Sequence, residues 1–367
     1  MMNPSKSLKR RLTRSHRRVW CGTLLLMAIA VLAAGCRQGE KPPAPVSSDP
    51  LKVKPIAFHQ QNEDEDYNAS GVVPIEDGRF LFCDNHVSNA LYELDLNPDG
   101  QQKGDVIRRP LQGVTGDGID DLEGMTLAEE NGHQFIFVAS SLSLKKAIQN
   151  LQDKPSRVPT DGLLRVTIDQ TYGLKAENMP GFRAWLIQHE PELAQAAKLA
   201  PNDDGLNIEG LAWDRQRHAL LFGLRSPVPE GKPLVLVIKV KDLAGAWTTD
   251  NLELLPAIRF VPETPMPRKE EQGIRSLEYI EALNTFLVIL GKSTDESEAP
   301  FALYAWDGQS TGVLRPLPVT FSKKMKPEGV TAGTVGGKPV LVFVDDGGGY
   351  QIVPQDALPA LGDKARQ

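Results

Sequence analysis

Cysteine and histidine are scarce in this chain, with three cysteines and six histidines among 367 residues. Cys21 and Cys36 lie in an N-terminal leader, which leaves Cys83 without a partner for an intramolecular disulfide. A disulfide-stapled fold is therefore excluded, and we expect Cys83, in a β-rich run, to be a buried and unreactive thiol. The absence of a Cys/His cluster also argues against a zinc site.

Long apolar runs and familiar catalytic motifs are missing too. The apolar run at 24–34 is shorter than the ~20 residues needed to span a bilayer. The chain has no G-x-S-x-G nucleophile elbow, no P-loop and no arrangement typical of a Ser-His-Asp triad. The glycine run at 347–349 follows a predicted strand and opens no helix, which indicates a turn rather than a phosphate-binding loop.

Residues 1–35 have the pattern of a bacterial export signal. Seven basic residues and no acidic one precede the apolar run, and the segment ends Ala33-Ala34-Gly35 before Cys36. This is a lipobox, so we predict lipidation at Cys36 and a flexible polar tether over 36–50. The alternative is an ordinary secretory signal with an incidental cysteine. Arg37, in place of an inner-membrane retention aspartate, favours the outer membrane of the cell envelope, facing the periplasm.

The charge balance limits the partners of the body of the protein. The chain has 41 basic and 47 acidic residues, and removing the leader with its seven basic residues leaves 34 against 47, a formal net charge of −13. An acidic body argues against non-specific nucleic-acid binding and suits cation binding. We expect a monomer that contacts the membrane through its lipid and has no nucleic-acid partner.

An irregular repeat runs through the rest of the chain. Five segments share a polar lead-in, then Ser or Glu, then an apolar run, and each is followed by a turn and a β-rich run. They are N-A-S-G-V around Ser70, D-L-E-G-M around Glu123, N-I-E-G-L around Glu209, I-R-S-L-E around Ser276 and K-P-E-G-V around Glu328. Repeats of this kind predict an all-β, five-bladed β-propeller over 51–355, with a surface tail at 356–367.

Two further features complete the predicted architecture. Residues 143–204 read as an insertion in the second blade, and near-helical spacing of apolar residues from Phe182 to Leu199 makes this insertion partly helical. The alternating segment 51–58 has no other place, so we predict that it supplies the outer strand of the last blade. The ring would then close with both ends of the chain in one sheet.

The repeated Ser and Glu positions predict a metal site. The innermost strands of a propeller start at the same face of the central channel, so these five side chains would converge there. Three carboxylates around one axis repel unless they are protonated, paired or bound to a cation. Glutamate and serine oxygens suit Ca²⁺, which takes ~6–8 oxygen ligands. The predicted ligands are Ser70, Glu123, Glu209, Ser276 and Glu328. The alternative is that each glutamate pairs with backbone amides or a nearby Arg or Lys and only shapes the blades.

A second set of residues, at the ends of the following strands, would reach the same face. Arg225 and Lys292 are candidates for binding an anion, because Arg and Lys suit phosphate or carboxylate groups. Asp84 and Asp345 are candidates for a general base or for groups that orient one. Taken singly, each of these charges is better explained as a solvated loop residue or a rim salt bridge.

The repeat segments also resemble known families. From about Ser70 to Val353 they resemble an uncharacterised bacterial domain-of-unknown-function family of β-propeller proteins, through D-D-L-E-G-M, N-I-E-G-L-A-W, L-L-F-G-L-R-S-P, I-R-S-L-E and K-P-E-G-V. The order Ser, Glu, Glu, Ser, Glu is more distantly similar to the calcium-activated nucleotidases (apyrases). That resemblance implies a five-bladed propeller with a central Ca²⁺ at the five predicted ligands. The other nucleotidase motifs have no match in this sequence.

Two functions are compatible with these observations. One is a calcium-dependent hydrolase of a small anionic, phosphoester-like substrate, anchored in the envelope. The other is a noncatalytic propeller that binds or scaffolds a partner, with the metal only making the ring rigid. An enzyme needs an open metal position beside acidic and basic groups, whereas a docking module needs an exposed apolar patch. The charged strand ends favour a polar mouth.

Overall fold

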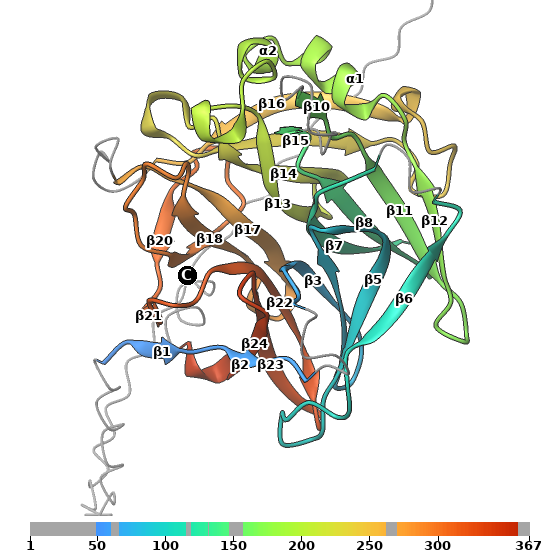
Figure 1. The fold of residues 1–367 in the computed structure, drawn as a ribbon, viewed down its shortest axis with the longest axis vertical. Helices are drawn as coiled ribbons and strands as arrows, with labels where there is room; N and C mark the ends of the chain where they lie inside the picture. The colour runs from blue at the N-terminus through green and yellow to red at the C-terminus, as the bar shows by residue number, and fades with distance from the viewer. Residues whose placement is uncertain are drawn as a thin grey trace, which may run out of the picture. The chain divides into compact units, whose positions relative to one another are not determined.

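The computed structural model describes residues 49–59, 66–114, 119–130, 132–146, 157–261 and 270–358. The predicted signal 1–35, the predicted lipidation residue Cys36 and most of the tether lie outside these residues. The described part of the chain is an all-β structure in which four-stranded antiparallel groups surround a centre (Figure 1). It is a β-propeller, as the repeat predicts.

Each group begins with its innermost strand, and the strands then follow one another outward. The first group holds β3 (Ala69–Glu76), β4 (Arg79–Asp84), β5 (Val87–Asp95) and β6 (Ile107–Gln112). The second holds β7 (Leu122–Glu130), β8 (His133–Ser140), β11 (Leu163–Ile168) and β12 (Leu174–Asn178). The third holds β13 (Asn207–Asp214), β14 (Ala219–Ser226), β15 (Leu234–Val240) and β16 (Leu252–Arg259).

The last two groups continue this order. The fourth holds β17 (Gln272–Ile280), β18 (Thr285–Lys292), β19 (Ala302–Trp306) and β20 (Leu314–Pro316). The fifth holds β22 (Pro327–Val335), β23 (Lys338–Asp345), β24 (Gly349–Pro354) and, outermost, β2 (Ile56–Ala57). The pairing of β2 with β24 confirms that a segment from the start of the body completes the last group.

Shorter strands link the groups at their edges. β1 (Leu51–Val53) pairs in parallel with β21 (Val319–Phe321), so the first strands of the body lie beside the last ones (Figure 1). β6 pairs in parallel with β12 and joins the outer edges of the first and second groups. β9 (Leu144–Lys146) and β10 (Arg157–Pro159) form a separate two-stranded ribbon.

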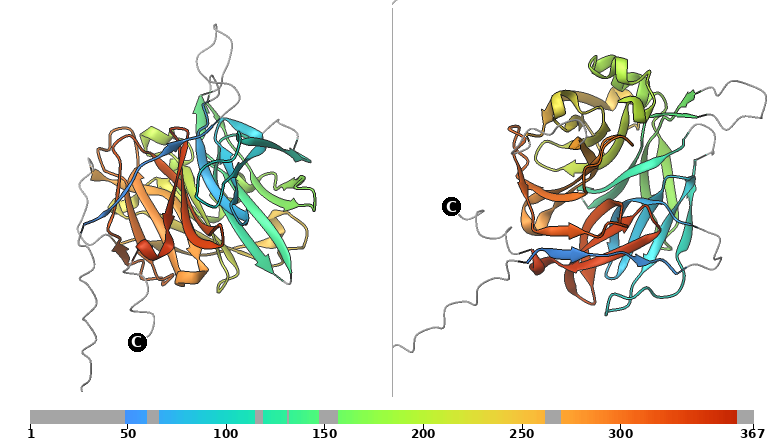
Figure 2. Two further views of the ribbon diagram at one scale, coloured as in Figure 1. Left: turned by 90° about the horizontal axis from the view of Figure 1, so that it is seen from below. Right: turned by 60° about the vertical axis from the view of Figure 1, so that its left-hand side comes forward.

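The helices lie between the second and third groups. α1 (Phe182–His189) and α2 (Leu193–Ala196) are followed by the 3-10 turn η1 (Pro201–Asp203), and both helices lie at one edge of the molecule (Figure 2). Phe182, Leu186 and Leu193 are fully buried, which is the apolar spacing that predicts a helix here. Within the predicted insertion 143–204, however, β11 and β12 are the regular outer strands of the second group.

Further 3-10 turns cap individual loops: η2 (Pro229–Gly231), η3 (Thr249–Asn251), η5 (Glu281–Leu283) and η6 (Gln355–Ala357). The last one lies where the sequence predicts the start of a surface tail. Leu358, which follows it, is 4% exposed and packs in the cluster between the fourth and fifth groups. The packed body therefore continues at least three residues beyond 355.

The hydrophobic core lies between successive groups. In β14, Leu220 and Phe222 pack in a cluster shared with the second group, whereas Leu221 packs in a cluster shared with the fourth. Alternate residues of a strand point to opposite faces, so a strand buried on both faces is apolar throughout. Three more clusters join the fourth group to the fifth, the fifth to the first and the first to the second. The interfaces therefore form a closed cycle.

The innermost strands approach one another closely, which explains the glycine of the repeat. A Cβ atom on Gly71 of β3 would lie 2.4 Å from the backbone nitrogen of Met125 on β7. A Cβ atom on Gly329 of β22 would lie 2.2 Å from the carbonyl oxygen of Ser70 on β3, where the cycle closes. Only a residue without a side chain fits at such contacts.

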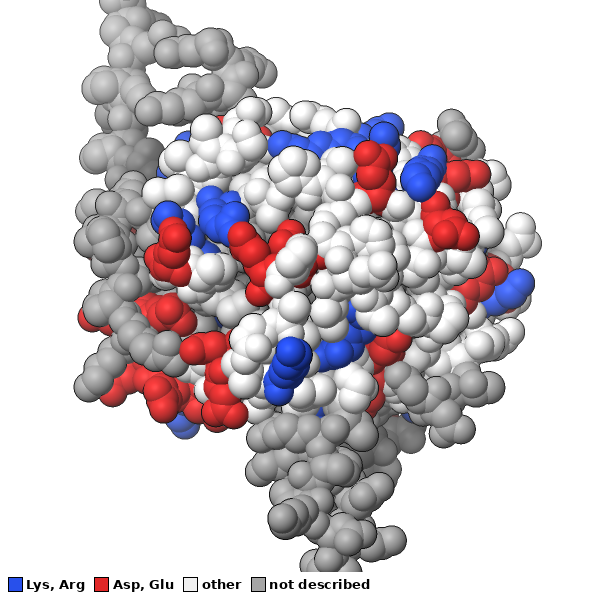
Figure 3. Space-filling view, turned by 90° about the horizontal axis from the view of Figure 1, so that it is seen from above, with Lys and Arg blue, Asp and Glu red and all other residues white. Residues whose placement is uncertain are grey.

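The surface seen in Figure 3 carries basic and acidic side chains side by side, with white surface between them. Among the described residues, no helix is long and apolar enough to cross a membrane.

Candidate functional site

The repeated glutamates lie at equivalent irregularities of the innermost strands. The strand pairing shifts register at Glu123 in β7, at Glu209 in β13 and at Glu328 in β22. A β-bulge leaves one residue out of the ladder and redirects its side chain. In β3 the corresponding shift spans Ser70 and Gly71. These four positions match the sequence-based alignment.

In the fourth group the equivalent position is held by Arg275, not by the predicted Ser276. The register of β17 shifts between Ile274 and Ser276, so Arg275 is the residue left out of the ladder. Ser276 stands where the other strands have glycine, and its Oγ accepts a hydrogen bond from the backbone nitrogen of Val330 on β22 at 3.2 Å. Its role is to tie two strands together. We call the five bulge positions the channel ring: Ser70, Glu123, Glu209, Arg275 and Glu328.

The sequence itself indicates that Arg275, not Ser276, is equivalent to the glutamates. The repeats read L-E-G-M, I-E-G-L and P-E-G-V, an apolar residue or proline, a charged residue, a small residue and an apolar residue. The fourth repeat, I-R-S-L, has the same form when its small serine is aligned with glycine. Aligning serine with glutamate because both carry oxygen misplaces the repeat by one residue.

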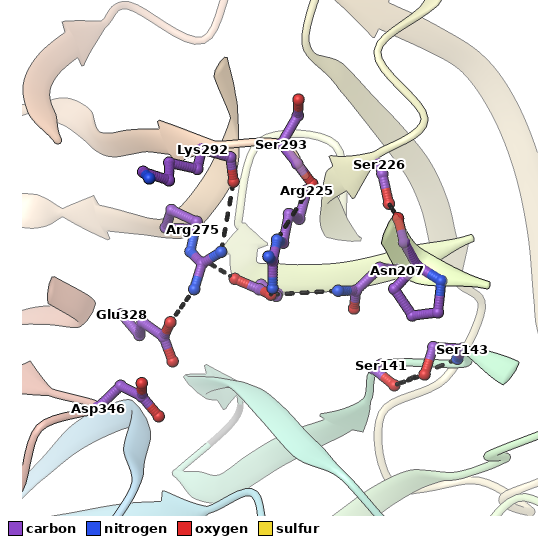
Figure 4. Close-up of polar contacts among 12 residues, drawn as sticks. Ser141, Ser143, Asn207, Arg225, Ser226, Arg275, Lys292, Ser293, Glu328 and Asp346 are labelled. Atoms are coloured by element: carbon purple, nitrogen blue, oxygen red, sulfur yellow. Dashed lines mark hydrogen bonds and ion pairs between the residues drawn. The ribbon is translucent and has the colours of Figure 1, made fainter. Parts of the chain in front are cut away.

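Arg275 bridges the two glutamates on the neighbouring strands. Its Nε lies 2.7 Å from Glu209 Oε2, although the N–H is not directed at that oxygen, so the contact is ionic. Its Nη2 pairs with Glu328 Oε1, and its Nη1 donates to the carbonyl oxygen of Lys292 at 3.4 Å (Figure 4). The residue is 6% exposed, and burial lowers the pKa of Arg275 to about 10. The guanidinium therefore remains charged at neutral pH.

Glu209 has a second cationic partner. Arg225 Nη1 lies 3.0 Å from Glu209 Oε1, and the amide nitrogen of Asn207 donates to the same oxygen at 3.2 Å. Arg225 also donates from Nε to the carbonyl oxygen of Ser293 at 3.2 Å. Arg225, predicted to bind an anion, thus reaches the site but already pairs with Glu209 and lies 3.9 Å from Asp295 Oδ1.

Ser70 and Glu123 occupy the other side of the channel ring. Ser70 Oγ donates to Glu328 Oε2 at 3.5 Å. Glu123 is buried, and its Oε2 has no hydrogen-bond partner within the described part of the chain. Burial raises the pKa of Glu123, and the nearby carboxylates of Asp121 and Glu209 raise it further. The Glu123 carboxyl group is therefore held toward its neutral form.

The channel ring opens into a cavity of about 960 Å³. Four ring residues line it, together with Arg225, Lys292 and residues of the loop before β22. Lys292 has an exposed side chain, and its ammonium forms no ion pair with any residue that the structure describes. Lys326 lines the cavity as well, but its Nζ lies 2.8 Å from Asp346 Oδ2. Lys323 also lines the cavity, is exposed and forms no ion pair within the described residues, so Lys292 and Lys323 are the cations available to meet an anionic ligand.

The two predicted general bases do not line this cavity. Asp84 accepts hydrogen bonds from the backbone nitrogens of Asn68 at 3.0 Å and His86 at 2.8 Å. Asp345 accepts one from the backbone nitrogen of Lys326. Both aspartates are buried and hold the chain in position. The residues that follow them, Asn85 and Asp346, line the cavity instead.

The predicted set of five calcium ligands does not fit this geometry. One of the five positions carries the guanidinium of Arg275, which pairs with two of the three glutamates. Two ring carboxylate oxygens, Glu123 Oε2 and Glu209 Oε2, have no hydrogen-bond partner in the described part of the chain, but Glu209 Oε2 lies 2.7 Å from Arg275 Nε, which leaves Glu123 Oε2 as the oxygen that a cation could use. Within the described ranges, no cluster of three or more His, Cys, Asp or Glu side chains is arranged to hold a metal ion. Calcium binding stays a prediction.

Residues 173–316 match a family described as "Protein of unknown function (DUF3616)". The match includes Glu209, Arg225, Arg275 and Lys292 and supports the predicted resemblance to an uncharacterised domain family. Comparison with curated protein sequences gave no match.

Solved structures with similar folds share little sequence with this chain. The major allergen Mala s 1 of Malassezia sympodialis is 12% identical over 80% of each chain, with a TM-score of 0.40. A GH43 β-1,3-galactosidase is 10% identical over 82% of this chain and 94% of its own, with a TM-score of 0.45. An α-L-arabinofuranosidase from Lactobacillus brevis is 10% identical over 79% and 90%, with a TM-score of 0.40. Likeness at this level bears on neither substrate nor reaction.

Proposed function

We propose that this protein is a lipid-anchored, five-bladed β-propeller of the bacterial cell envelope whose central cavity binds a small ligand with an anionic group. The observation that carries the proposal is the channel ring itself. Arg275 pairs there with Glu209 and Glu328, while Lys292 lines the same cavity and its ammonium group has no ion-pair partner in the described part of the chain.

Charge pairing in the ring lowers the repulsion between its glutamates and an anionic ligand. Three ionised glutamates at the end of a channel would repel an anion. Here Arg275 pairs with Glu209 and Glu328, Arg225 pairs again with Glu209, and Glu123 is held toward its neutral form. Lys292 can then attract a phosphate or carboxylate group in a cavity that Asp295, Glu298 and Asp346 also line, where Asp346 is paired with Lys326 and Asp295 lies 3.9 Å from Arg225.

Hydrolysis of such a ligand is the second candidate. A buried carboxyl group with a raised pKa is suited to act as a general acid, and Glu123 lines the cavity. The substrate would be a phosphoester or a lactone, with Glu123 donating the proton to the leaving oxygen. Asp84 and Asp345 are not available as the base, because both hold backbone amides. This lack of the predicted base is the reason that binding ranks ahead of hydrolysis.

Calorimetric titration with inorganic phosphate, a sugar phosphate and a dicarboxylate tests the binding proposal. Lys292→Gln should weaken binding of the preferred anion by roughly tenfold, the effect of losing one charged hydrogen bond of about 1.5 kcal/mol. Lys338→Gln, an exposed lysine on β23 that does not line the cavity, is the matched control and should bind normally. Equal affinity of the two variants for the anion would show that Lys292 does not contact the ligand. A hydrolysis screen over phosphoesters and lactones, with and without Ca²⁺, tests the second candidate.

A further inference from the structure

The position and contacts of Arg275 point to a role that a metal ion would otherwise fill. We infer that Arg275 is the resident cation of the channel ring and that the ring therefore needs no divalent metal. This inference concerns the ring alone and is independent of what the cavity binds.

Arg275 stands at a ligand position and does the bridging that a central ion would do. The register shift in β17 gives it the same place that Glu209 has in β13 and Glu328 has in β22. These are the innermost strands on either side of β17 in the cycle. Because its guanidinium contacts both glutamates, one positive group joins three neighbouring strands at the channel.

All three nitrogens of this guanidinium are engaged. Nε meets Glu209, Nη2 meets Glu328 and Nη1 donates to the Lys292 carbonyl oxygen, while the group also lies 5.7 Å from the ring centre of Phe301. A buried charge without partners is strongly destabilising. Arg275 and its two glutamates therefore depend on each other.

The ring glutamates on either side of Arg275 are already paired with cations. The guanidinium of Arg275 contacts Glu209 and Glu328, whereas that of Arg225 contacts Glu209 and lies 3.9 Å from Asp295 Oδ1. A Ca²⁺ ion at the same centre would lie close to a fixed positive charge and would compete with it for the same oxygens. Removing the Arg275 guanidinium reverses this situation, because it frees the Glu328 carboxylate and leaves Glu209 paired with Arg225 alone, beside Glu123 and Ser70.

The test compares three forms of the full-length protein by thermal melting in excess chelator and in millimolar Ca²⁺, together with metal analysis after purification. The parent should melt at the same temperature in both buffers and contain no stoichiometric metal. Arg275→Ser, which places a second serine in the ring, should melt lower in chelator and regain roughly 5 °C in Ca²⁺. Arg275→Lys keeps the charge and should show no response to Ca²⁺.

Two results would overturn the inference. A parent protein that holds one equivalent of Ca²⁺, or melts several degrees higher in its presence, would show that the ring binds metal with Arg275 in place. A folded Arg275→Ser variant without any Ca²⁺ response would show that Arg275 does not stand at a metal position. If that variant fails to fold, the metal content and melting of the parent still decide the question.

Discussion

Asp84 and Asp345 occupy the same position in two different groups of the propeller and make the same hydrogen bond to the backbone. Each ends the second strand of its group and accepts a hydrogen bond from the backbone nitrogen two residues before the channel-ring residue. For Asp84 that nitrogen belongs to Asn68, ahead of Ser70. For Asp345 it belongs to Lys326, ahead of Glu328. The repeat therefore preserves a structural contact at positions where the sequence pattern predicts a catalytic base.

Asp84→Ala should lower the stability of the protein while leaving ligand binding intact in the molecules that remain folded. The substitution strips two backbone amides of their acceptor, and a buried unpaired amide costs about 1–3 kcal/mol. Urea denaturation measures the change. Asp99→Ala, at an exposed turn where the carboxylate accepts only the Gln101 amide, is the control and should cost much less. A stable Asp84→Ala protein that no longer binds the ligand would show that Asp84 takes part in ligand binding.

Glu209→Gln separates the arginine-paired ring from a calcium ring. The amide cannot neutralise Arg225 and Arg275, and removing one partner of a buried ion pair costs about 3–5 kcal/mol. We expect this loss in chelator as well as in Ca²⁺, measured by denaturant unfolding. Glu253→Gln, on the exposed face of β16, serves as the control. A Glu209→Gln protein that matches the parent in chelator but gains less from added Ca²⁺ would favour the metal instead.

The raised pKa of Glu123 predicts a pH dependence of stability. A carboxyl group whose pKa is higher in the folded protein than its value of about 4.3 in the unfolded chain makes the folded state bind more protons. Its unfavourable contribution is absent at pH values below 4.3 and grows as the pH rises from there toward the folded pKa. The slope is at most about 1.4 kcal/mol per pH unit for one proton.

Glu123→Gln mimics the neutral carboxyl group and should remove this slope. We expect the variant to equal the parent near pH 5 and to exceed it near pH 8 in denaturant unfolding. Glu129→Gln, exposed on the same strand β7, should keep the slope of the parent. Parallel pH profiles for the parent and Glu123→Gln would show that Glu123 is ionised in the folded protein.

The lipobox predicts that the mature protein is held at the membrane by acyl chains, which contribute about 0.8 kcal/mol per buried CH₂. Cys36→Ala should release the protein or leave it unprocessed, and cell fractionation measures this. Cys21→Ala changes a cysteine within the signal and should leave membrane association unchanged. Membrane association of Cys36→Ala equal to that of the parent would contradict the anchor.

The sequence by itself determined the features that depend on local pattern. Runs that are apolar at every position, such as 220–222, are typical of strands buried on both faces. The structure places this strand between two hydrophobic clusters. The E-G pairs predict the repeat, and in the structure each of them lies at a bulge beside a close strand contact. The apolar spacing from Phe182 to Leu193 predicts the helices. Each of these signals lies within one short segment of the chain.

Only the tertiary structure decided which residue of each repeat faces the channel and what that residue meets. Arg275 and Ser276 are adjacent, and the register of β17 against β18 selects Arg275 for the channel. Its partners, Glu209 and Glu328, lie on other strands, so no local pattern reveals the pairing. Strand register also explains why Asn85 and Asp346 line the cavity and the predicted Asp84 and Asp345 do not. A shift of one residue in a strand turns a side chain to the opposite face, and hydrogen bonds between strands set that register.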